Sequence, residues 1–501
     1  MKRVTMFITL LLVFSLMLNV CGESSAEKRD TINISVNMIA TNIDPHNRAS
    51  LVHDQIKTHV YESFYQLNEW TGEYEPRVAA SHTVSGDGLT YTFKLRPGVK
   101  FHNGETLKAS DAVFSINRAI KDASVAQFVA PIEKAEADGD DTVIVTLKYP
   151  FAPFMHHMRM IYIISEKAVQ EIGEGNMASM PANAGTGPYY MTSYRPDIAI
   201  EYEAFADYYR GEAAIKKIVS RPFPDVNTGL IAFENGELDF YTVPLANWAE
   251  IESSGKYNTR MVPQNHISVV RMNPNRSPLN DIRVREAITL CVDRQALNVL
   301  SYEGYAVDAP KILYPGYVFG APPLDYGTVH EPNIEKAKKL LAEAGYPNGV
   351  NIGELRCIAG MYYEKTTTAL QASLARAGIT ARVAPLEQSS CVTANINGDF
   401  GVTVYGYGNQ FDYSYMSFLI DFTVGELYTP LFDDVRPLLE QGASENDPEI
   451  RKELYKQADE LIMNKFYMIP IFYRTSAFAW DKNLNLVPPA LYYNVYDWSW
   501  N

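Results

Sequence analysis

The alternation of strand-like and helix-like segments between residues 350 and 408 is the feature that most restricts the fold of this chain. Residues 350–359, 380–386 and 401–408 read as strands. A helical pattern at 365–378 separates the first two, and another helix is expected before the third. Parallel strands need crossover connections of this kind, usually helices. We therefore predict an α/β fold with a parallel sheet in this part of the chain.

The rest of the chain continues in mixed α/β order, and its 501 residues are expected to form roughly three folding units at about 150 residues each. The expected elements are a strand at 31–39, a helix at 53–67, a hairpin at 81–95 that turns at Asp87-Gly88, a helix at 108–120 with Ser110 as its N-cap, a helix at 226–235, a strand at 266–273, single helices at 281–300, 333–345 and 451–464, and an extended segment at 467–480.

The charge of the chain excludes one class of partner. There are 44 Lys and Arg residues against 59 Asp and Glu, and the formal net charge is −15. No basic cluster offsets this balance, and an acidic surface repels phosphate backbones. Nucleic acid is therefore not expected as a partner. Hydrophobic residues make up 47% of the chain, which is typical of globular proteins and leaves enough material for a large core.

The first twenty residues have the layout of a secretory signal peptide. Two basic residues precede the uncharged, mainly apolar stretch 4–20, and small and polar residues follow. The sequence around Cys21 resembles a bacterial lipobox, in which this cysteine becomes the lipidated first residue. Cleavage after Ala26, which follows small residues, is the alternative for a freely secreted protein. In both cases residues 21–30 include a short polar tether.

Motifs of catalysis and metal binding are missing from the sequence. It contains no G-x-S-x-G, H-E-x-x-H, P-loop or complete G-x-G-x-x-G, and residues 185–187 and 406–408 only begin like the last of these. Adjacent His156 and His157 are expected to point in different directions and not to share a metal. We therefore expect neither a cofactor nor a metal. Missing motifs do not exclude an enzyme, but the 59 scattered carboxylates indicate no acid/base pair.

Three cysteines lie beyond Cys21, and their spacing suits neither a metal site nor a disulfide framework. Cys291 is expected on the apolar side of a helix as a small buried residue. Cys357 and Cys391 each lie next to a strand-like segment. Whether they pair depends on a Cα separation below about 7 Å, so this point stays open.

Tyrosine is the residue type that the sequence offers for ligand binding, with 33 in the chain. The densest group lies at 402–418, where a strand ends in two glycines and polar residues follow. Tyrosine supplies contact area and a hydroxyl at little cost in conformational entropy, and open α/β sheets bind ligands beyond the carboxyl ends of their strands. This segment is therefore expected to contact a small polar ligand.

Read in order, several segments resemble family 5, the peptide/nickel class, of the extracytoplasmic solute-binding proteins that deliver ligands to ABC importers. The resemblance covers nearly the whole chain. The matching blocks are NIDPH with YESFY, residues 75–119, TGPYYMTSY, residues 205–240, SPLNDIRVREAITLCVDRQAL, PNIEKAKKLLAEAGYPNGV and RKELYKQADELIMNKFYMIPIFY.

The resemblance implies a bilobed clamp like that of periplasmic binding proteins, of the cluster C type, with an extra N-terminal subdomain. Lobe I would comprise residues 31–262 and 476–501, including a subdomain inserted at about 45–180, and lobe II residues 263–475. Ligand would lie between the lobes. The partners would be the permease subunits of the importer and, through them, its ATPase subunits, and the protein itself would act as a monomer.

The resemblance also points to individual ligand-binding residues: Tyr405, Tyr407, Asn409, Gln410 and Asp412 in one loop, and His266 at the crossover into lobe II. Peptide binders of this class typically carry an aspartate three residues after the loop's aromatic residue, where it holds the ligand's α-amino group. Counted from Tyr407, that position is Gln410 here, and Asp412 stands two residues later.

A second departure concerns the ligand carboxylate. Many dipeptide binders hold it with an arginine just after the strand that corresponds to residues 350–359. Here that stretch reads GMYYEKTTT and contains no arginine, while Arg356 lies within the strand and is expected to be structural.

The predicted function is extracytoplasmic capture of a small ligand, with a peptide as the first expectation, for delivery to an ABC importer. Nickel complexes, glycans and opine-like molecules are the alternative ligands. A peptide-binding chaperone or a signal receptor would share the fold, and an enzyme on the same fold is the least favoured alternative.

Overall fold

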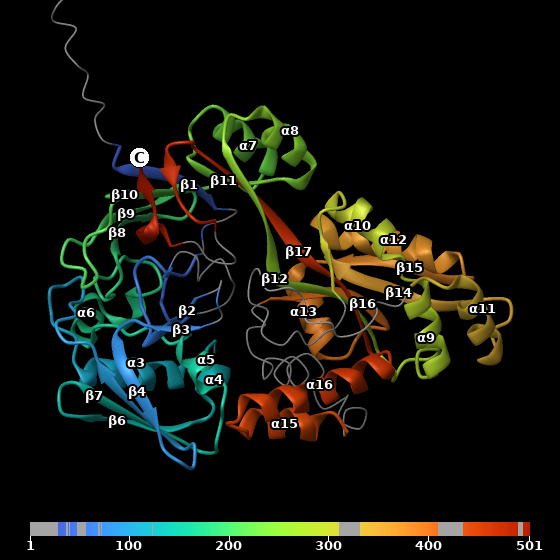
Figure 1. The fold of residues 1–501 in the computed structure, drawn as a ribbon, viewed down its shortest axis with the longest axis horizontal. Coiled ribbons are helices and arrows are strands. Elements are labelled where there is room, and N and C mark those ends of the chain that lie inside the picture. Colours follow the sequence, from blue (N-terminus) through green and yellow to red (C-terminus); the bar gives the residue numbers. More distant parts are fainter. Residues whose placement is uncertain are drawn as a thin grey trace, which may run out of the picture.

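The fold is described here from a computed structural model. The described residues are 29–36, 39, 41–47, 57–68, 71, 73–122, 124–309, 331–408, 434–488 and 494–501. They form a mixed α/β structure in which one large sheet extends through two halves of the molecule, and a smaller sheet lies beside one half (Figure 1). The predicted α/β class is confirmed.

The large sheet holds the two halves together. Within the described residues it has 11 strands, in the order β15-β14-β16-β12-β17-β11-β1-β10-β9-β8, with β13 paired to β17. The strands are β1 (Thr31–Val36), β8 (Tyr189–Arg195), β9 (Ala199–Ala204), β10 (Lys217–Pro222), β11 (Phe240–Val243), β12 (Asn258–Met272), β13 (Val307–Asp308), β14 (Val350–Ile358), β15 (Ile379–Leu386), β16 (Val402–Gly408) and β17 (Met468–Trp480).

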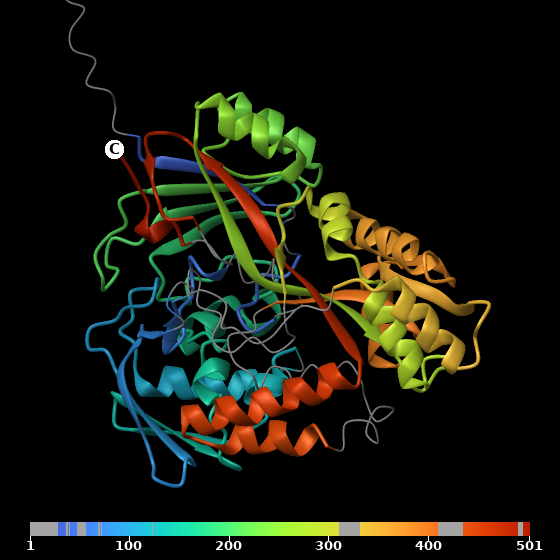
Figure 2. The same ribbon diagram turned by 45° about the vertical axis from the view of Figure 1, so that its right-hand side comes forward.

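The long antiparallel strands β12 and β17 run from one half to the other (Figure 2). At one end β17 also pairs with β11, and at the other end β12 also pairs with β16. Between these two ladders the register shifts: Pro263 pairs with Thr475, whereas the next pair is Ile267 with Tyr473. Three residues of β12 therefore lie opposite the single residue Arg474, in a bulge at the junction between the halves.

The predicted parallel unit is confirmed. β14 pairs in parallel with both β15 and β16, and α12 (Met361–Ala375) and α13 (Gln388–Ile396) connect these strands. The first crossover leads outward from β14 and the second leads back past it, so right-handed connections place the two helices on opposite faces of the sheet. Buried Leu355, Leu370 and Val402 belong to the core of this half.

The described helices around the large sheet are α7 (Val226–Glu234), α8 (Trp248–Ser254), α9 (Ile282–Cys291), α10 (Arg294–Tyr302), α11 (Ile334–Glu343), α15 (Arg436–Ser444) and α16 (Pro448–Asn464). Short 3-10 turns lie at η1 (Glu174–Asn176), η2 (Leu245–Asn247) and η4 (Val495–Asp497), and the C-terminal segment adds β18 (Leu484–Asn485) and β19 (Ser499–Trp500). The predicted helix at 226–235 is confirmed. The predicted helix at 281–300 is two helices, because Asp293 accepts a hydrogen bond from the Ala296 amide and caps a new helix.

The smaller sheet has its own core. Its order is β4-β5-β7-β6, with β4 (Ala79–Val84), β5 (Thr90–Leu95), β6 (Ile132–Asp138) and β7 (Thr142–Leu147). Phe93, Val143 and Ile116 are buried between this sheet and α3 (Ala109–Lys121). The hairpin predicted at 81–95 is confirmed. The remaining elements here are β2 (Tyr65–Leu67), β3 (Tyr74–Pro76), α4 (Ala126–Val129), α5 (Phe154–Met158) and α6 (Glu166–Ile172).

Two predictions in this region are wrong. Lys108, not Ser110, is the N-cap of α3, and the Asp111 carboxylate accepts a hydrogen bond from the Lys108 amide. The helix predicted at 53–67 does not continue beyond Lys57 in the described residues, because Tyr65–Leu67 pairs as β2 with β3. Tertiary pairing outweighs the helical spacing of the apolar residues here.

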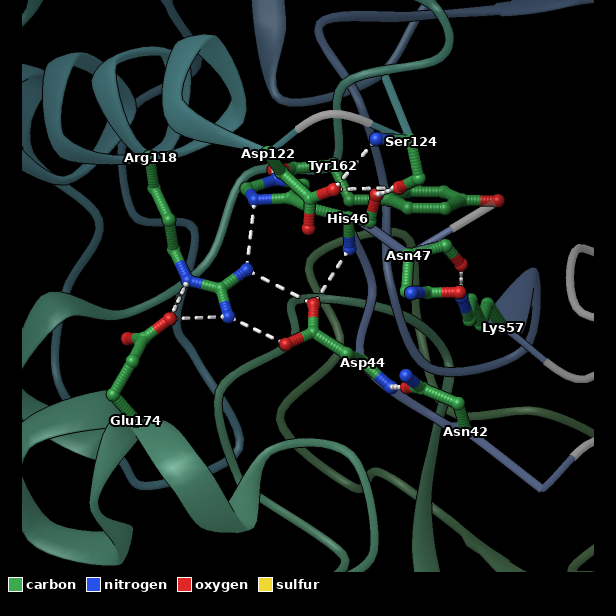
Figure 3. A network of polar contacts seen from close by, with 10 residues as sticks. All are labelled: Asn42, Asp44, His46, Asn47, Lys57, Arg118, Asp122, Ser124, Tyr162 and Glu174. Atoms are coloured by element: carbon green, nitrogen blue, oxygen red, sulfur yellow. Dashed lines mark hydrogen bonds and ion pairs between the residues drawn. The ribbon is translucent and has the colours of Figure 1, made fainter. Parts of the chain in front are cut away.

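A buried polar network attaches residues 41–47 to α3 (Figure 3). Arg118 donates hydrogen bonds to both carboxylate oxygens of Asp44, to His46 Nδ1 and to Glu174. His46 Nε2 in turn lies 2.9 Å from the carbonyl oxygen of Tyr162. All five N–H groups of Arg118 have acceptors, so this guanidinium is fully used in holding the structure together.

A polar contact joins the smaller sheet's core to the helices α15 and α16. The amide of Ala152 donates to the carbonyl oxygen of Ala443 at 2.8 Å. Nearby, the turn glycine Gly88 lies against the side chain of Asn446. α15 and α16 pack instead on β12 and β17 through Leu439 and Tyr455. The contact thus connects the segment that follows β7, beside the smaller sheet, to α15.

Candidate ligand-binding site

The bulge between β12 and β17 lies at the centre of a group of aromatic and ionisable side chains. The group consists of His266 on β12, Tyr302 at the end of α10, Tyr362 and Tyr363 in the first turn of α12, Tyr405 on β16 and Arg474 on β17. We call this group the crossover cluster. Three of these elements, α10, α12 and β16, belong to the same half of the molecule, and the two long strands bring the cluster to the junction with the other half.

Four tyrosine rings form the apolar part of the crossover cluster. Tyr362 and Tyr363 have ring centroids 4.3 Å apart, and Tyr302 lies 5.2 Å from Tyr362. Tyr363 is stacked with Tyr405 at 6.5 Å and an interplanar angle of 17°. Tyr302 is held by contacts with Phe472 and with the hydroxyl of Ser268, 3.3 Å from its own. The rings are therefore fixed by packing before any ligand arrives.

Gly406 permits the close approach of two of these side chains. A Cβ at this position would lie 2.2 Å from Tyr363 Oη and 2.3 Å from His266 Cε1. Any larger residue would displace the tyrosine or the imidazole. Gly406, which sequence analysis noted only as the start of an incomplete glycine motif at a strand end, therefore has a packing reason within the site.

His266 is neutral in this environment. Burial, and then the charge of Arg474, hold the pKa of His266 well below its ordinary value. Its Nε2 atom lies 3.5 Å from Tyr363 Oη, and its Nδ1 atom is buried without a hydrogen-bond partner in the part of the chain that the structure describes. With Tyr363 as donor to Nε2, the imidazole proton resides on Nδ1 and is available to an acceptor.

Arg474 carries the charge of the crossover cluster. Its guanidinium carbon lies 4.2 Å from the centroid of the Tyr362 ring, and the side chain is half-buried. An arginine remains charged at any physiological pH. The hydroxyls around it do not supply a negative charge, because burial raises the pKa of both Tyr302 and Tyr363 above their ordinary value. The cluster therefore has a net positive charge.

The structure brings two of the residues proposed from the sequence into the crossover cluster, Tyr405 and His266. Tyr407 lies on the same strand, β16, where its backbone pairs with Ile267, beside His266. Asn409, Gln410 and Asp412 lie outside the described residues, and so does Cys21. Of the proposed site residues, the structure thus describes those at the end of β16 and the neighbouring His266.

Sequence analysis missed four members of the cluster: Tyr302, Tyr362, Tyr363 and Arg474. Tyr362 and Tyr363 belong to the stretch that was examined only for an arginine. Arg474 interrupts the apolar run 467–480, and a charged residue in such a run is the signal that would have identified it. Arg474, from β17, is stacked on Tyr362, a tyrosine of the stretch that follows β14.

The other residues considered from the sequence have structural surroundings. Cys291, Cys357 and Cys391 are buried and free, so Cys357 and Cys391 do not pair. His156 is buried beside the hydroxyl of Tyr74. Among the described residues no group of three His, Cys, Asp or Glu side chains could hold a metal ion. The helices that the structure describes include none long and apolar enough to cross a membrane.

Comparison with known proteins decides the family. The model for bacterial extracellular solute-binding proteins, family 5, matches residues 73–425. The chain belongs to this family. The glutathione-binding protein GsiB of Escherichia coli O1:K1 is 28% identical over 477 residues, 90% of each chain. NikA from Brucella suis, solved with Fe(III)-EDTA, has a TM-score of 0.82 at 21% identity and covers 94% of this chain and 100% of its own.

DppA from Helicobacter pylori, solved with the peptide STSA, has a TM-score of 0.75 at 24% identity, with 91% of this chain and 95% of that chain covered. These likenesses confirm the bilobed fold that was predicted from the sequence. They also confirm the function class: the protein is a substrate-binding component of an ABC importer. Its relatives are extracytoplasmic solute-binding proteins and not enzymes.

Proposed function

We propose that the ligand of this solute-binding protein is a peptide and that it binds at the crossover cluster, between the two halves of the molecule. The observation that carries the proposal is the position of fixed tyrosines, a neutral histidine and a cationic arginine at the bulge where β12 and β17 pass between the halves. Aromatic faces suit the apolar parts of a peptide, and the polar groups suit its ends. The glutathione bound by GsiB and the peptide bound by DppA support this ligand class.

The proposed lobes are residues 31–262 with 476–501, including the subdomain inserted at about 45–180, and residues 263–475. These limits agree with the position of the bulge, because both crossing strands change halves there. Closure of the lobes around the ligand would create the form that the importer's permease subunits recognise. The protein would act as a monomer and without catalysis of its own.

The proposed ligand contacts are Tyr405, Tyr407, Asn409, Gln410 and Asp412 along the segment that begins in β16, together with His266 on β12, whose backbone pairs with Gly408. Asp412 is proposed to hold the α-amino group of the peptide. An unpaired ammonium in a closed cleft costs several kcal/mol, so a carboxylate partner is needed there.

The proposal is tested by mass spectrometry of the small molecule released from the purified full chain, followed by calorimetry with that molecule. A peptide is expected. Tyr407→Ala should weaken its binding at unchanged thermal stability. A non-peptide ligand would refute the proposed ligand class, whereas wild-type affinity in the Tyr407→Ala variant would refute the assignment of this residue.

Asp412→Asn distinguishes the ligand classes. The exchange keeps the shape of the side chain and removes its charge, and it should cost about 2 to 5 kcal/mol of binding free energy for a peptide with a free amino group. For a neutral glycan the cost should be small. Calorimetry with a free and an N-acetylated form of the same peptide measures the difference, and equal losses for both forms would contradict an amine contact.

We further propose that the protein is anchored to the membrane through a lipidated Cys21. One acyl chain gives only marginal binding to a bilayer, so stable anchoring needs the multiple acylation of bacterial lipoproteins. A Cys21→Ala variant expressed in the native host should appear in the medium. Identical partitioning of variant and wild type would favour cleavage after Ala26.

A further inference from the structure

Arg474 is a charged side chain for which the described structure provides no counter-charge. It makes no ion pair and no hydrogen bond within the described residues, and its recorded partner is the face of Tyr362. A guanidinium has five N–H donors, and leaving them unused in a half-buried position costs free energy. Stacking on a tyrosine offsets only part of this cost, typically about 1 kcal/mol.

Arg474 lies between the two ladders that β17 forms with β12. It lies opposite the β12 bulge, between the last pair of one ladder, Pro263 with Thr475, and the first pair of the next, Ile267 with Tyr473. Tyr473 and Thr475 on either side are buried. The backbone of Arg474 thus lies at the junction of the two halves, and stacking on Tyr362 positions its guanidinium.

The groups around Arg474 favour an anion. His266 is neutral, and its Nδ1 atom has no hydrogen-bond partner among the described residues. Tyr362 belongs to the first turn of α12, so the positive end of a 15-residue helix faces the same place. Glu364, in the same turn, accepts a hydrogen bond from the Gly360 amide at 2.9 Å and is the one acidic residue in this first turn, where its negative charge opposes an anion.

We propose that Arg474, stacked on Tyr362 and assisted by His266, binds a carboxylate of the ligand. The proposal rests on the function proposed above and specifies the ligand as one that carries a carboxylate where the lobes meet. An arginine can hold a carboxylate through two parallel hydrogen bonds, and stacking on a ring leaves the edge of the guanidinium free for them. The histidine supplies a further donor or acceptor for the same group.

The experiment compares two probe mixtures on the purified full chain: random tripeptides as free acids, and the same tripeptides amidated at the C-terminus. Bound peptides are measured by equilibrium dialysis and mass spectrometry. Wild type should retain the free acids at least about tenfold better than the amides. Arg474→Met should lose this preference by losing affinity for the acids, and Arg474→Lys should keep part of it.

Arg382→Met is the matched control, because it removes an equal charge from an arginine that is 71% exposed on β15. It should bind both mixtures like wild type. If Arg474→Met binds the free acids as well as wild type does, or if wild type binds acids and amides equally, the carboxylate contact is refuted while the peptide proposal stands.

A third probe, a mixture of non-peptide mono- and dicarboxylic acids, separates the two proposals. Arg474-dependent binding of these acids without binding of tripeptides supports the carboxylate subsite and refutes the peptide. Binding of none of the probes by wild type overturns the carboxylate inference itself. Thermal unfolding without ligand is measured in parallel. The melting temperature of Arg474→Met should match or exceed that of wild type, because the variant loses only the stacking on Tyr362 and removes a half-buried charge that has no counter-charge in the described structure.

Discussion

Arg118 and Arg474 both carry a guanidinium group, but the two groups differ in whether their N–H donors have acceptors. All five N–H groups of Arg118 donate to Asp44, His46 and Glu174, and the residues around it tie an N-terminal segment to α3 (Figure 3). Arg474 has a tyrosine face and no acceptor in the described part of the chain. The hydrogen-bond donors of Arg118 are all satisfied without a ligand, whereas those of Arg474 are not satisfied within the described residues.

The difference separates structure from function within one chain. A satisfied buried cation contributes to the fold, since removing any partner leaves a charge unpaired. An unsatisfied one reduces stability and persists where a ligand completes it. The following predictions test whether this distinction holds, in order of decreasing effect.

The largest effect is expected from Asp44→Asn. The side chain of Asp44 is 12% exposed and that of Arg118 is 11% exposed, so the variant removes the buried counter-charge of the guanidinium and leaves only the exposed Glu174. The free energy of unfolding should fall by about 3 to 5 kcal/mol. Urea denaturation followed by circular dichroism measures it. Arg474→Met, without ligand, should stay within about 1 kcal/mol of wild type, and equal losses in the two variants would abolish the distinction.

The second-largest effect is expected from acid, which should weaken the polar network around Arg118 and His46. Burial lowers the pKa of His46 to about 4, from 6.5 in the unfolded chain. Below pH 6.5 His46 binds a proton in the unfolded chain but stays neutral in the folded chain. The free energy of unfolding therefore falls as the pH drops from 6.5 to 4. The loss should be about 2 to 3 kcal/mol between pH 7 and pH 4.5. Denaturation at both pH values in His46→Gln should show a smaller difference than in wild type, and an unchanged difference would mean that His46 is not held neutral.

Gly406→Ala tests the packing of the crossover cluster. The added methyl group would meet Tyr363 and His266 at less than van der Waals distance, so the two side chains should move at a cost of about 2 kcal/mol in unfolding free energy. Ligand affinity should fall at least about tenfold. In the control Gly401→Ala the nearest atoms lie 3.6 Å from the new Cβ. Calorimetry that finds equal affinities for both variants would exclude Gly406 from the site.

The smallest effect is expected from Glu174→Gln. Glu174 also pairs with Arg118, but its side chain is 63% exposed and its interaction is screened by solvent. The free energy of unfolding should change by less than about 1 kcal/mol. Denaturation of this variant beside Asp44→Asn shows which partner of Arg118 contributes more to the free energy of unfolding. A loss as large as that of Asp44→Asn would mean that the exposure of a carboxylate does not predict its contribution in this network.

Much of the fold could be predicted from local sequence pattern. The hairpin at 81–95 and the parallel unit β14–β16 carry their periodicity and turn signals in short segments. The break between α9 and α10 depends on one capping aspartate, Asp293, inside an otherwise continuous helical pattern. β2 forms because it pairs with β3, which helical spacing in residues 53–67 does not reveal.

The site was predictable only in part, for a related reason. Tyr405 and His266 lie on strands that pair directly, so a strand-end argument could find both. Tyr302, Tyr362 and Arg474 come from three elements far apart in sequence, and the stacking of Arg474 on Tyr362 arises from the crossing of two long strands. Only the assembled sheet brings them together.

The contact between the Ala152 amide and the Ala443 carbonyl has a kinetic consequence. A single hydrogen bond of this kind contributes about 1 kcal/mol net, and water replaces it readily when the surfaces separate. Neither partner uses its side chain in this bond, so its strength is insensitive to what those side chains are. This bond should therefore add little to the barrier for separating the smaller sheet from α15.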